Sequence, residues 1–374
     1  MSVRMHSFRR FQLKPAPRPG KALTSPSSIL LYCRRGFEKE CAAEILVQTQ
    51  AAGISGHVRA KENSAYVVFV AHEPEILANR AARLRFDALI FARQRIFASG
   101  PLADLPVDDR ITPLLDTAAG LQRRYSTLWL ETADTNEAKE LAAFTRKFER
   151  PFAAAAAGLL GGGPQAPRLH VFFLTSTAAY LGYTLPDDSA PWPCGIPRLK
   201  LPRSAPSRST LKLEEAFLVF VDRPETMLRP GMSAVDLGAA PGGWTWQLVR
   251  RHIRTTAVDN GNLDPALLDS GLVTHLRTDG FRFRPSRPVD WLVCDMVEQP
   301  SRIARLVADW AADGAFRYAV FNLKLPMNRR YEEVERCRGL IEERLAAQGV
   351  SHRLRFRQLY HDREEVTGFL ELVS

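Results

Sequence analysis

The sequence contains few cysteines and no long apolar run. Its five cysteines are scattered, their number is odd, and no two of them form a Cys-x-x-Cys pair. This usage argues against a disulfide framework and a structural zinc site, and it favours a reducing cytoplasm. No apolar stretch reaches the ~20 residues that span a bilayer, and Arg9 and Arg10 interrupt any apolar signal core. We therefore expect neither a membrane partner nor a bound metal.

Acidic residues are missing from two segments. Residues 1–25 hold six Lys and Arg residues and several prolines but no Asp or Glu, so we expect a basic arm there. The second segment runs from Gly195 to Lys212. The whole chain carries 51 basic and 41 acidic residues, a net charge of +10. This surplus suits a polyanionic partner such as nucleic acid, although an ordinary basic protein would show the same balance.

Length and composition predict several domains. With 374 residues, 45% of them hydrophobic, the chain is long enough for two or three packed units. We expect strands at residues 29–32, 64–70, 127–131, 168–174 and 178–183, and helices at 38–50 and 137–157. These elements divide into two small α+β units, residues 26–100 and 101–186. A basic, proline-rich linker, residues 187–208, follows, and we favour phosphate contacts for its cations over a purely solvated role.

The last part of the chain, residues 209–374, alternates strands with helices. Strand patterns lie at residues 233–237, 255–259, 289–294 and 318–322, with a final pair at 354–359 and 367–373. Helical patterns lie at residues 302–312 and 331–347. Such alternation predicts an α/β fold with a doubly wound, mostly parallel sheet. No internal repeat of 20–50 residues is apparent.

A glycine-rich turn follows the first of these strands, in the sequence Asp236-Leu-Gly-Ala-Ala-Pro-Gly-Gly243. Small residues let the backbone approach a ligand closely. Asp259 ends the next strand, 21 residues after the first glycine, where a carboxylate accepts hydrogen bonds from ribose hydroxyls. These features are compatible with NAD as well as with S-adenosylmethionine. The turn residues that we expect beside the cofactor are Gly238, Ala240, Pro241, Gly242 and Gly243.

Two further carboxylates favour S-adenosylmethionine. Asp279, in Arg277-Thr-Asp-Gly280, follows a further sheet segment between the strands at 255–259 and 289–294, where the adenine amino group of that cofactor would need an acceptor. A simple turn residue before Gly280 is nearly as good an explanation. Asp295 ends the strand at 289–294, at the carboxyl edge of the sheet, which is the functional edge of such folds.

Two lysines and a glutamate can join Asp295 at this edge. Lys324 ends the strand that begins at residue 318, Lys212 begins the helix that enters the last unit, and Glu364 or Glu365 begins the final strand. A ribose 2′-hydroxyl is a poor nucleophile, so methyl transfer to it needs a base. We expect Lys324 to be that base, with a pKa held well below ~10.4 by burial and by the second lysine. Solvent-exposed lysines are the simpler alternative, more so for Lys212.

Five motifs together resemble those of the FtsJ-type ribose methyltransferases, and the bacterial enzymes of this family that act on 23S rRNA are the nearest match. Ala240 stands where relatives often have Cys, and the doubled Glu leaves one catalytic position open. The motifs are Ser207-Arg-Ser-Thr-Leu-Lys-Leu-Glu214, Asp236-Leu-Gly-Ala-Ala-Pro-Gly-Gly-Trp-Thr245, Val293-Cys-Asp-Met296, Phe321-Asn-Leu-Lys-Leu-Pro326 and Gln358-Leu-Tyr-His-Asp-Arg-Glu-Glu365.

The resemblance implies a fold, a site and a substrate. The fold is a Rossmann-like class I methyltransferase domain (residues 209–374) after a ferredoxin-like domain (26–100) and a THUMP RNA-binding domain (101–186). Lys324 would accept the proton, and Lys212, Asp295 and Glu364 or Glu365 would complete a tetrad. The substrate would be a cytidine in the peptidyl-transferase loop of 23S rRNA, as naked rRNA or in a pre-50S particle. The residues implied for the S-adenosylmethionine pocket are Ser209, Ala240, Pro241, Gly242, Gly243, Asp259, Asp279 and Asp295.

Other functions stay open at this point. The same fold could carry an NAD-dependent oxidoreductase, a 2′-O-methyltransferase of another RNA, or a non-catalytic RNA-binding factor in ribosome assembly. We expect a monomer or a weak homodimer.

Overall fold

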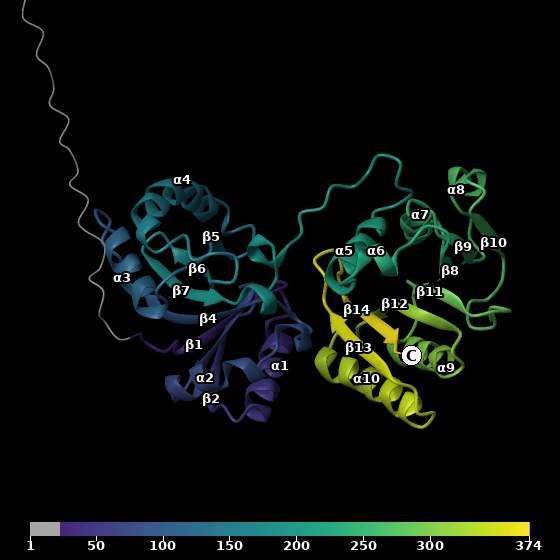
Figure 1. The fold of residues 1–374 in the computed structure, drawn as a ribbon, viewed down its shortest axis with the longest axis horizontal. Helices are drawn as coiled ribbons and strands as arrows, with labels where there is room; N and C mark the ends of the chain where they lie inside the picture. The colour runs from purple at the N-terminus through teal and green to yellow at the C-terminus, as the bar shows by residue number, and fades with distance from the viewer. Residues whose placement is uncertain (1–22, 374) are drawn as a thin grey trace, which may run out of the picture.

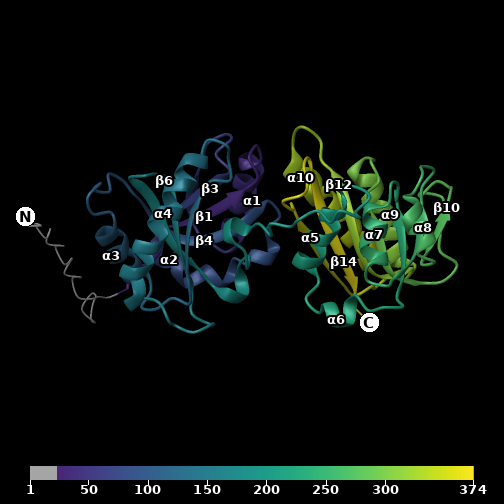
Figure 2. The ribbon, with the colours of Figure 1, turned by 90° about the horizontal axis from the view of Figure 1, so that it is seen from above.

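The computed structural model describes residues 23–373 and arranges them around two seven-stranded sheets, one in each half of the chain (Figures 1 and 2). Except for its last three residues, the expected basic arm at 1–25 lies outside the described residues. All five cysteines are unpaired. Among residues 23–373, no helix has the length and apolar character needed to cross a bilayer.

The N-terminal sheet has the strand order β2-β3-β1-β4-β7-β6-β5. Neighbouring strands in this sheet are antiparallel, except for β5 and β6, which are parallel and joined by a helical crossover. The long strand β4 pairs with β1 on one side and with β7 on the other, so the sheet continues across the boundary expected near residue 100. The strands are β1 (Ser28–Cys33), β2 (Gly56–Ala60), β3 (Tyr66–Ala71), β4 (Ala92–Leu102), β5 (Leu128–Thr132), β6 (Arg168–Thr175) and β7 (Ala178–Thr184).

Helices cover this sheet where its side chains are apolar. In β1, Ile29 and Leu31 pack on the side of α1, whereas Leu30 and Tyr32 point to the other face, as expected for alternating side chains. The expected strands and helices of this half are found, with ends shifted by a few residues. The helices are α1 (Glu38–Ala51), α2 (Pro74–Arg80), α3 (Ile111–Leu121) and α4 (Lys139–Ala155).

The C-terminal sheet confirms the predicted doubly wound architecture. Its order is β10-β9-β8-β11-β12-β14-β13; the pairs from β10 to β12 are parallel, and β14 pairs antiparallel with both β12 and β13. The chain order reverses between β8 and β11, and ligands of such sheets bind at this switch point. The strands are β8 (Ser233–Leu237), β9 (Arg254–Val258), β10 (Val273–Leu276), β11 (Val289–Cys294), β12 (Phe316–Lys324), β13 (His352–Arg357) and β14 (Glu365–Leu372).

Two layers of helices hold the central strands of this sheet. In β11, Trp291 and Val293 pack in the cluster formed with α5 and α7, and Leu292 and Cys294 pack in the cluster formed with α9 and α10. All four side chains are fully buried, so the position of the strand end is fixed from both faces. The helices are α5 (Thr210–Phe220), α6 (Pro224–Met227), α7 (Gly243–Val249), α8 (Pro265–Asp269), α9 (Pro300–Ala312) and α10 (Arg330–Ala346).

The two halves touch along the edge strand β13 and along α10. The backbone N–H of Gln358 donates to the carbonyl of Ile90 at 2.8 Å, and the buried Arg357 donates to the carbonyl of Ala92 at 2.7 Å. On the α10 side, Arg330 donates to the carbonyl of Gly36 at 3.2 Å. The Gln358 bond occupies a backbone group beside the edge strand β13 that would otherwise be free for association with other chains.

We predict that Asp236→Asn stabilises the protein increasingly as the pH rises from about 4 to 7. Asp236, the last residue but one of β8, is fully buried; its Oδ2 accepts from the Thr245 hydroxyl at 2.6 Å and its Oδ1 has no partner. Burial raises the pKa of this carboxyl to about 7. Since its folded pKa exceeds the unfolded value, the stability that it contributes is complete below pH ~4 and is lost as the pH rises through 7.

The neutral amide avoids this loss, so the variant should gain on the order of 3 kcal/mol over the parent between pH 4 and pH 8. Denaturant unfolding of both proteins at several pH values measures the difference. A difference that stays constant with pH would contradict the prediction.

Candidate active site

Four charged side chains meet at the carboxyl edge of the C-terminal sheet. Lys212 lies in the first turn of α5, Asp295 directly follows β11, Lys324 is the last residue of β12, and Glu365 is the first of β14. Lys324 and Glu365 are direct partners in the antiparallel β12–β14 register. The sheet therefore places two of the four opposite each other, and the ends of β11 and α5 bring the other two.

The four groups alternate in charge. The Lys212 ammonium lies 3.3 Å from Asp295 Oδ2 and 2.5 Å from Glu365 Oε1. The Lys324 ammonium lies 2.5 Å from Asp295 Oδ1 and also contacts Glu365 Oε2. Each lysine thus touches both carboxylates, and the set is neutral overall. Solvent exposure of these side chains ranges from 6% for Glu365 to 24% for Lys324, so Lys324 is the most accessible member.

The pKa of Lys324 runs opposite to our expectation. Burial lowers it, but the negative charges of Asp295 and Glu365, with the hydrogen bonds to both, raise it more, and the net pKa lies above the usual lysine value. The expected lowering by burial and a second cation is therefore wrong for this set of four residues, because the amine makes direct ion pairs with two carboxylates. In the structure described here Lys324 is an ammonium.

The two adjacent glutamates have different surroundings. Glu364 is 62% exposed in its side chain and pairs with Arg330 at 2.7 Å. Successive residues at the start of a strand point in opposite directions, so only one of the two can face the lysines. The structure places Glu365 in the set and Glu364 outside it.

A second layer of polar side chains lies directly behind the charged set. Asn322 is two residues before Lys324, and Thr367 is two residues after Glu365, so both pairs share one side of the sheet. Asn322 Nδ2 donates to Asp295 Oδ1 at 3.0 Å, and Asn322 Oδ1 accepts from the Thr367 hydroxyl at 2.8 Å. This layer was not predicted from the sequence, although Asn322, a polar residue inside an apolar run, was a visible signal.

Hydrogen-bond directions in this layer imply a protonated carboxyl. Thr367 has one proton to donate, and Asn322 takes it, yet both oxygens of Asp362 lie 3.0–3.2 Å from the same hydroxyl. All three side chains are completely buried. Burial and the charge of Glu365 raise the pKa of Asp362 well above its usual value. If Asp362 is neutral and donates to Thr367, each of the three side chains has a hydrogen-bond partner, and the orientation of Asn322 is fixed.

The glycine-rich turn lies at the end of β8, at the switch point of the sheet. Gly242 has a φ of 114°, a conformation that favours glycine. A side chain at Gly243 would meet the hydroxyls of Ser207 and Ser209, at 2.5 and 2.3 Å from its Cβ. The Ala240–Pro241 peptide bond is cis. The turn is therefore packed closely against Ser207 and Ser209, at a place that excludes larger residues.

The remaining expected cofactor residues surround this turn. Asp259 holds it in place, since its carboxylate accepts from the N–H of Ala240 at 3.0 Å and of Gly261 at 2.7 Å. Gly238, with a φ of 77°, approaches Met296 beside Asp295. Asp279 is half exposed and accepts from the N–H of Phe281 at 2.8 Å, as a turn residue does. The structure thus brings Gly238 and Asp259 to the turn, and leaves Asp279 half exposed and accessible.

Comparison with known proteins identifies the three parts of the chain. The model of the RlmM ferredoxin-like domain matches residues 27–96, that of the N-terminal region of ribosomal RNA large subunit methyltransferase M matches 109–185, and that of the FtsJ-like methyltransferases matches 205–322. None of these three models carries the THUMP name, which stays a prediction.

Full-length relatives agree with these matches. Ribosomal RNA large subunit methyltransferase M of Cellvibrio japonicus is 52% identical over 349 residues, 92% of this chain and 99% of the relative. The protein of the same name from an Azoarcus species is 51% identical over 353 residues, 93% of this chain and 97% of the relative. Among solved structures, TrmN of Thermus thermophilus aligns at 16% identity over 92% of this chain and 99% of its own, with a TM-score of 0.35.

We predict that Thr367→Val destabilises the protein by about 1–3 kcal/mol, whereas Thr367→Ser does not. Valine keeps the shape but removes the hydroxyl, which leaves buried polar atoms of Asn322 and Asp362 without a partner. Serine keeps the hydroxyl and loses only a methyl group. Denaturant unfolding of the two variants measures the difference, and equal stability would contradict the assigned chain of hydrogen bonds.

Proposed function

The chain belongs to the ribosomal RNA large subunit methyltransferase M family, and from this premise we propose that it methylates the 2′-oxygen of a cytidine ribose in the peptidyl-transferase loop of 23S rRNA. The methyl donor would be S-adenosylmethionine, and Lys324 would take the proton of the hydroxyl. The observation that carries this proposal is the set of Lys212, Asp295, Lys324 and Glu365 at one sheet edge.

The residues around the glycine-rich turn fit S-adenosylmethionine. Gly243 lets the turn pack closely against Ser207 and Ser209, whose hydroxyls lie 2.7 Å apart and are only partly buried, so they can bond to a cofactor. Asp259 and Asp279 supply carboxylates that can accept from the ribose hydroxyls and the adenine amine. When bound, the cofactor supplies an electrophilic methyl group and a positive charge. The family is one of methyltransferases, so we set aside the NAD-dependent oxidoreductase.

The lysine base needs to lose its proton before it can act. In the set of four residues its two carboxylate neighbours hold Lys324 as an ammonium. A further cation at this edge lowers the pKa of an amine by repulsion, and so does exclusion of water. Because the set has no net charge, one added positive charge can change the pKa of Lys324. We infer that Lys324 becomes a base only when the site is filled.

The other three residues have supporting roles. Asp295 and Glu365 each contact both lysines, so they hold the Lys324 amine in one place through its protonated and neutral states. Lys212 pairs with the same two carboxylates. Its charge therefore weakens the effect by which they raise the pKa of Lys324. After proton transfer Lys324 is again an ammonium, the state that the resting set stabilises.

The surface leading to this edge suits RNA. The linker cations Lys200, Arg203 and Arg208 are exposed and make no ion pair with any residue in 23–373. They precede Lys212 along the chain and give a phosphate backbone several contacts. We expect a cytoplasmic protein, a monomer or weak homodimer, that acts on 23S rRNA or a pre-50S particle. Methylation of another RNA is the alternative within the same chemistry, and a non-catalytic assembly role is the alternative outside it.

We predict that Lys324→Ala and Lys324→Arg both lower the methylation rate by ~10²–10⁴, the usual contribution of a general base. Arginine keeps the positive charge but cannot release its proton at ordinary pH. Binding of S-adenosylmethionine should be retained, as calorimetry can check. Mass-spectrometric mapping of 23S rRNA from cells with and without this gene identifies the methylated ribose. An intact methyl in cells that carry Lys324→Ala would favour the assembly-factor alternative.

We also predict that Glu365→Gln shifts the pH dependence of methylation, whereas Glu364→Gln leaves it unchanged. Glu365 raises the pKa of Lys324, so its neutral form should move the rising limb of the pH–rate profile down by about one unit or more. Glu364 lies outside the set and is the matched control. Single-turnover rates between pH 6 and 10 measure the shift. An upward shift, or equal shifts in both variants, would contradict the assignment.

A further inference from the structure

A cavity of about 520 Å³ lies on the N-terminal half, next to the loop that leads into the charged set. Its walls come from the end of β5, from the first turns of α4, and from the start of the linker at Cys194 and Arg198. Tyr360, in the loop between β13 and β14, closes it from the C-terminal half. Its volume is in the range of ligand clefts, roughly 300–1,000 Å³.

Tyr360 connects this cavity to the helix that carries Lys212. The N–H groups of Tyr360 and His361 donate to the Glu215 carboxylate at 2.8 and 2.9 Å, and Glu215 is three residues after Lys212 on α5. The guanidinium of Arg93 lies 5.1 Å from the centre of the Tyr360 ring. A molecule in the cavity is therefore held against the same loop that continues to Glu365.

The cavity carries an excess of positive charge. Lys139, Arg146 and Arg198 line it, are exposed, and have no ion-pair or hydrogen-bond partner on their side chains within residues 23–373. Arg35 also lines it but pairs with Glu137 at 3.1 Å.

The two carboxylates in the wall do not neutralise these cations. Glu131 is buried and accepts from the Tyr32 hydroxyl at 2.8 Å and from the N–H of Cys194, and it lies 2.7 Å from His170. Asp134 pairs with Arg93 at 3.4 Å. Three cations without partners around one cavity call for an anion with several charges.

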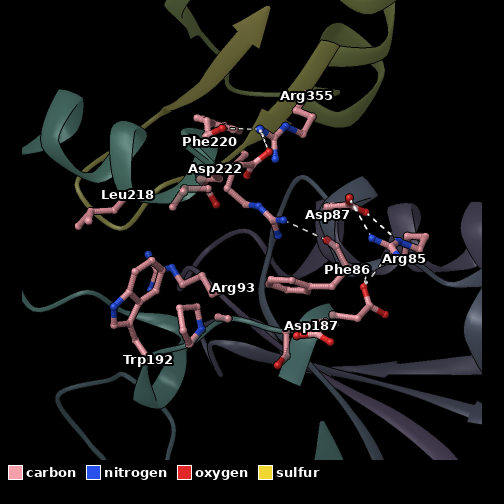
Figure 3. Close-up of a pocket in the computed structure, with 18 of the residues that line it drawn as sticks. Arg85, Phe86, Asp87, Arg93, Asp187, Trp192, Leu218, Phe220, Asp222 and Arg355 are labelled. Carbon is pink, nitrogen blue, oxygen red and sulfur yellow. Dashed lines mark hydrogen bonds and ion pairs between the residues drawn. The ribbon is translucent and has the colours of Figure 1, made fainter. Parts of the chain in front are cut away.

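A larger cavity, of about 610 Å³, lies between the halves (Figure 3), and its cations are paired. Several arginines line it, but they already have partners. Arg355 donates to the carbonyl of Phe220 at 2.5 Å and lies 3.7 Å from Asp222, and Arg85 pairs with Asp87 at 3.4 Å. This cavity is close to charge balance, so we assign the anion to the cavity beside Tyr360.

We propose that the cavity formed by Lys139, Arg146, Arg198 and Tyr360 binds the phosphodiester backbone of single-stranded RNA that flanks the methylated nucleotide. The proposal rests on the proposed function and names where its substrate is held. Phosphates of one strand would meet the three cations, and an unstacked base would have the Tyr360 ring beside it. From Arg198 the linker cations continue the contacts toward Lys212.

The experiment compares two triple variants that lose the same charge. Lys139→Ala/Arg146→Ala/Arg198→Ala removes the three cavity cations. The control is Arg123→Ala/Arg229→Ala/Arg317→Ala: these exposed arginines lie at the opposite, amino ends of strands β5, β8 and β12. The RNA is unmethylated 23S rRNA from cells that lack the gene. Filter binding across a range of salt concentrations gives Kd and its salt dependence, and methylation is measured on the same samples.

For the cavity variant we expect at least a tenfold weaker Kd at low salt and a salt slope smaller by about two, since each single-strand phosphate contact contributes ~0.7. Its methylation rate at saturating RNA should stay within about threefold of the parent, because the charged set is untouched. The control variant should bind more tightly than the cavity variant and keep the slope of the parent.

Two outcomes would overturn the inference while the proposed function stands. The first is a cavity variant with the Kd and salt slope of the parent. The second is a cavity variant that binds naked rRNA normally and loses only binding to pre-50S particles, which would indicate a protein partner. Failure of the parent protein to methylate any ribose would instead reject the proposed function.

Discussion

The attraction between two lysines and two carboxylates at one sheet edge is the interaction on which the rest of the structure depends. Lys324 and Glu365 are held opposite each other by the β12–β14 register, and Asp295 follows the buried strand β11. Removing one charge from such a partly buried set leaves another charge without a partner. The resulting loss of stability is larger than the net stability that the intact set contributes. The buried strands and the layer of Asn322, Thr367 and Asp362 behind it hold this arrangement in place.

Most of the site could be predicted because strand ends are readable in sequence. Lys324 and Asp295 follow apolar runs, and parallel strands place their carboxyl ends at one edge. The choice between Glu364 and Glu365 could not be made, since it depends on which face the first residue of β14 points to. The direction of the Lys324 pKa shift was also out of reach, because it is a balance between burial and two carboxylates whose distances the sequence does not contain.

The fold could be predicted where apolar and polar side chains alternate, but not where arginines are buried. The sheets and most helices follow apolar patterns, but the long strand β4 was not expected, since Arg93 and Arg95 interrupt its apolar run. Both are buried and pair with Asp134 and Asp188, which lie far away in the sequence. Because β4 pairs with β1 and β7, missing it hid the continuous sheet of the N-terminal half.

The loop between β13 and β14 explains how two distant parts of the chain can act on one nucleotide. Glu215 accepts the N–H groups of Tyr360 and His361 and so fixes this loop to α5, which carries Lys212. On its other side the loop meets the N-terminal half, where Arg34 donates to the carbonyl of Tyr360 at 3.2 Å. The next residues lead to Glu365. The loop therefore connects the half that we expect to hold RNA with the helix that carries Lys212 and with the strand that begins at Glu365.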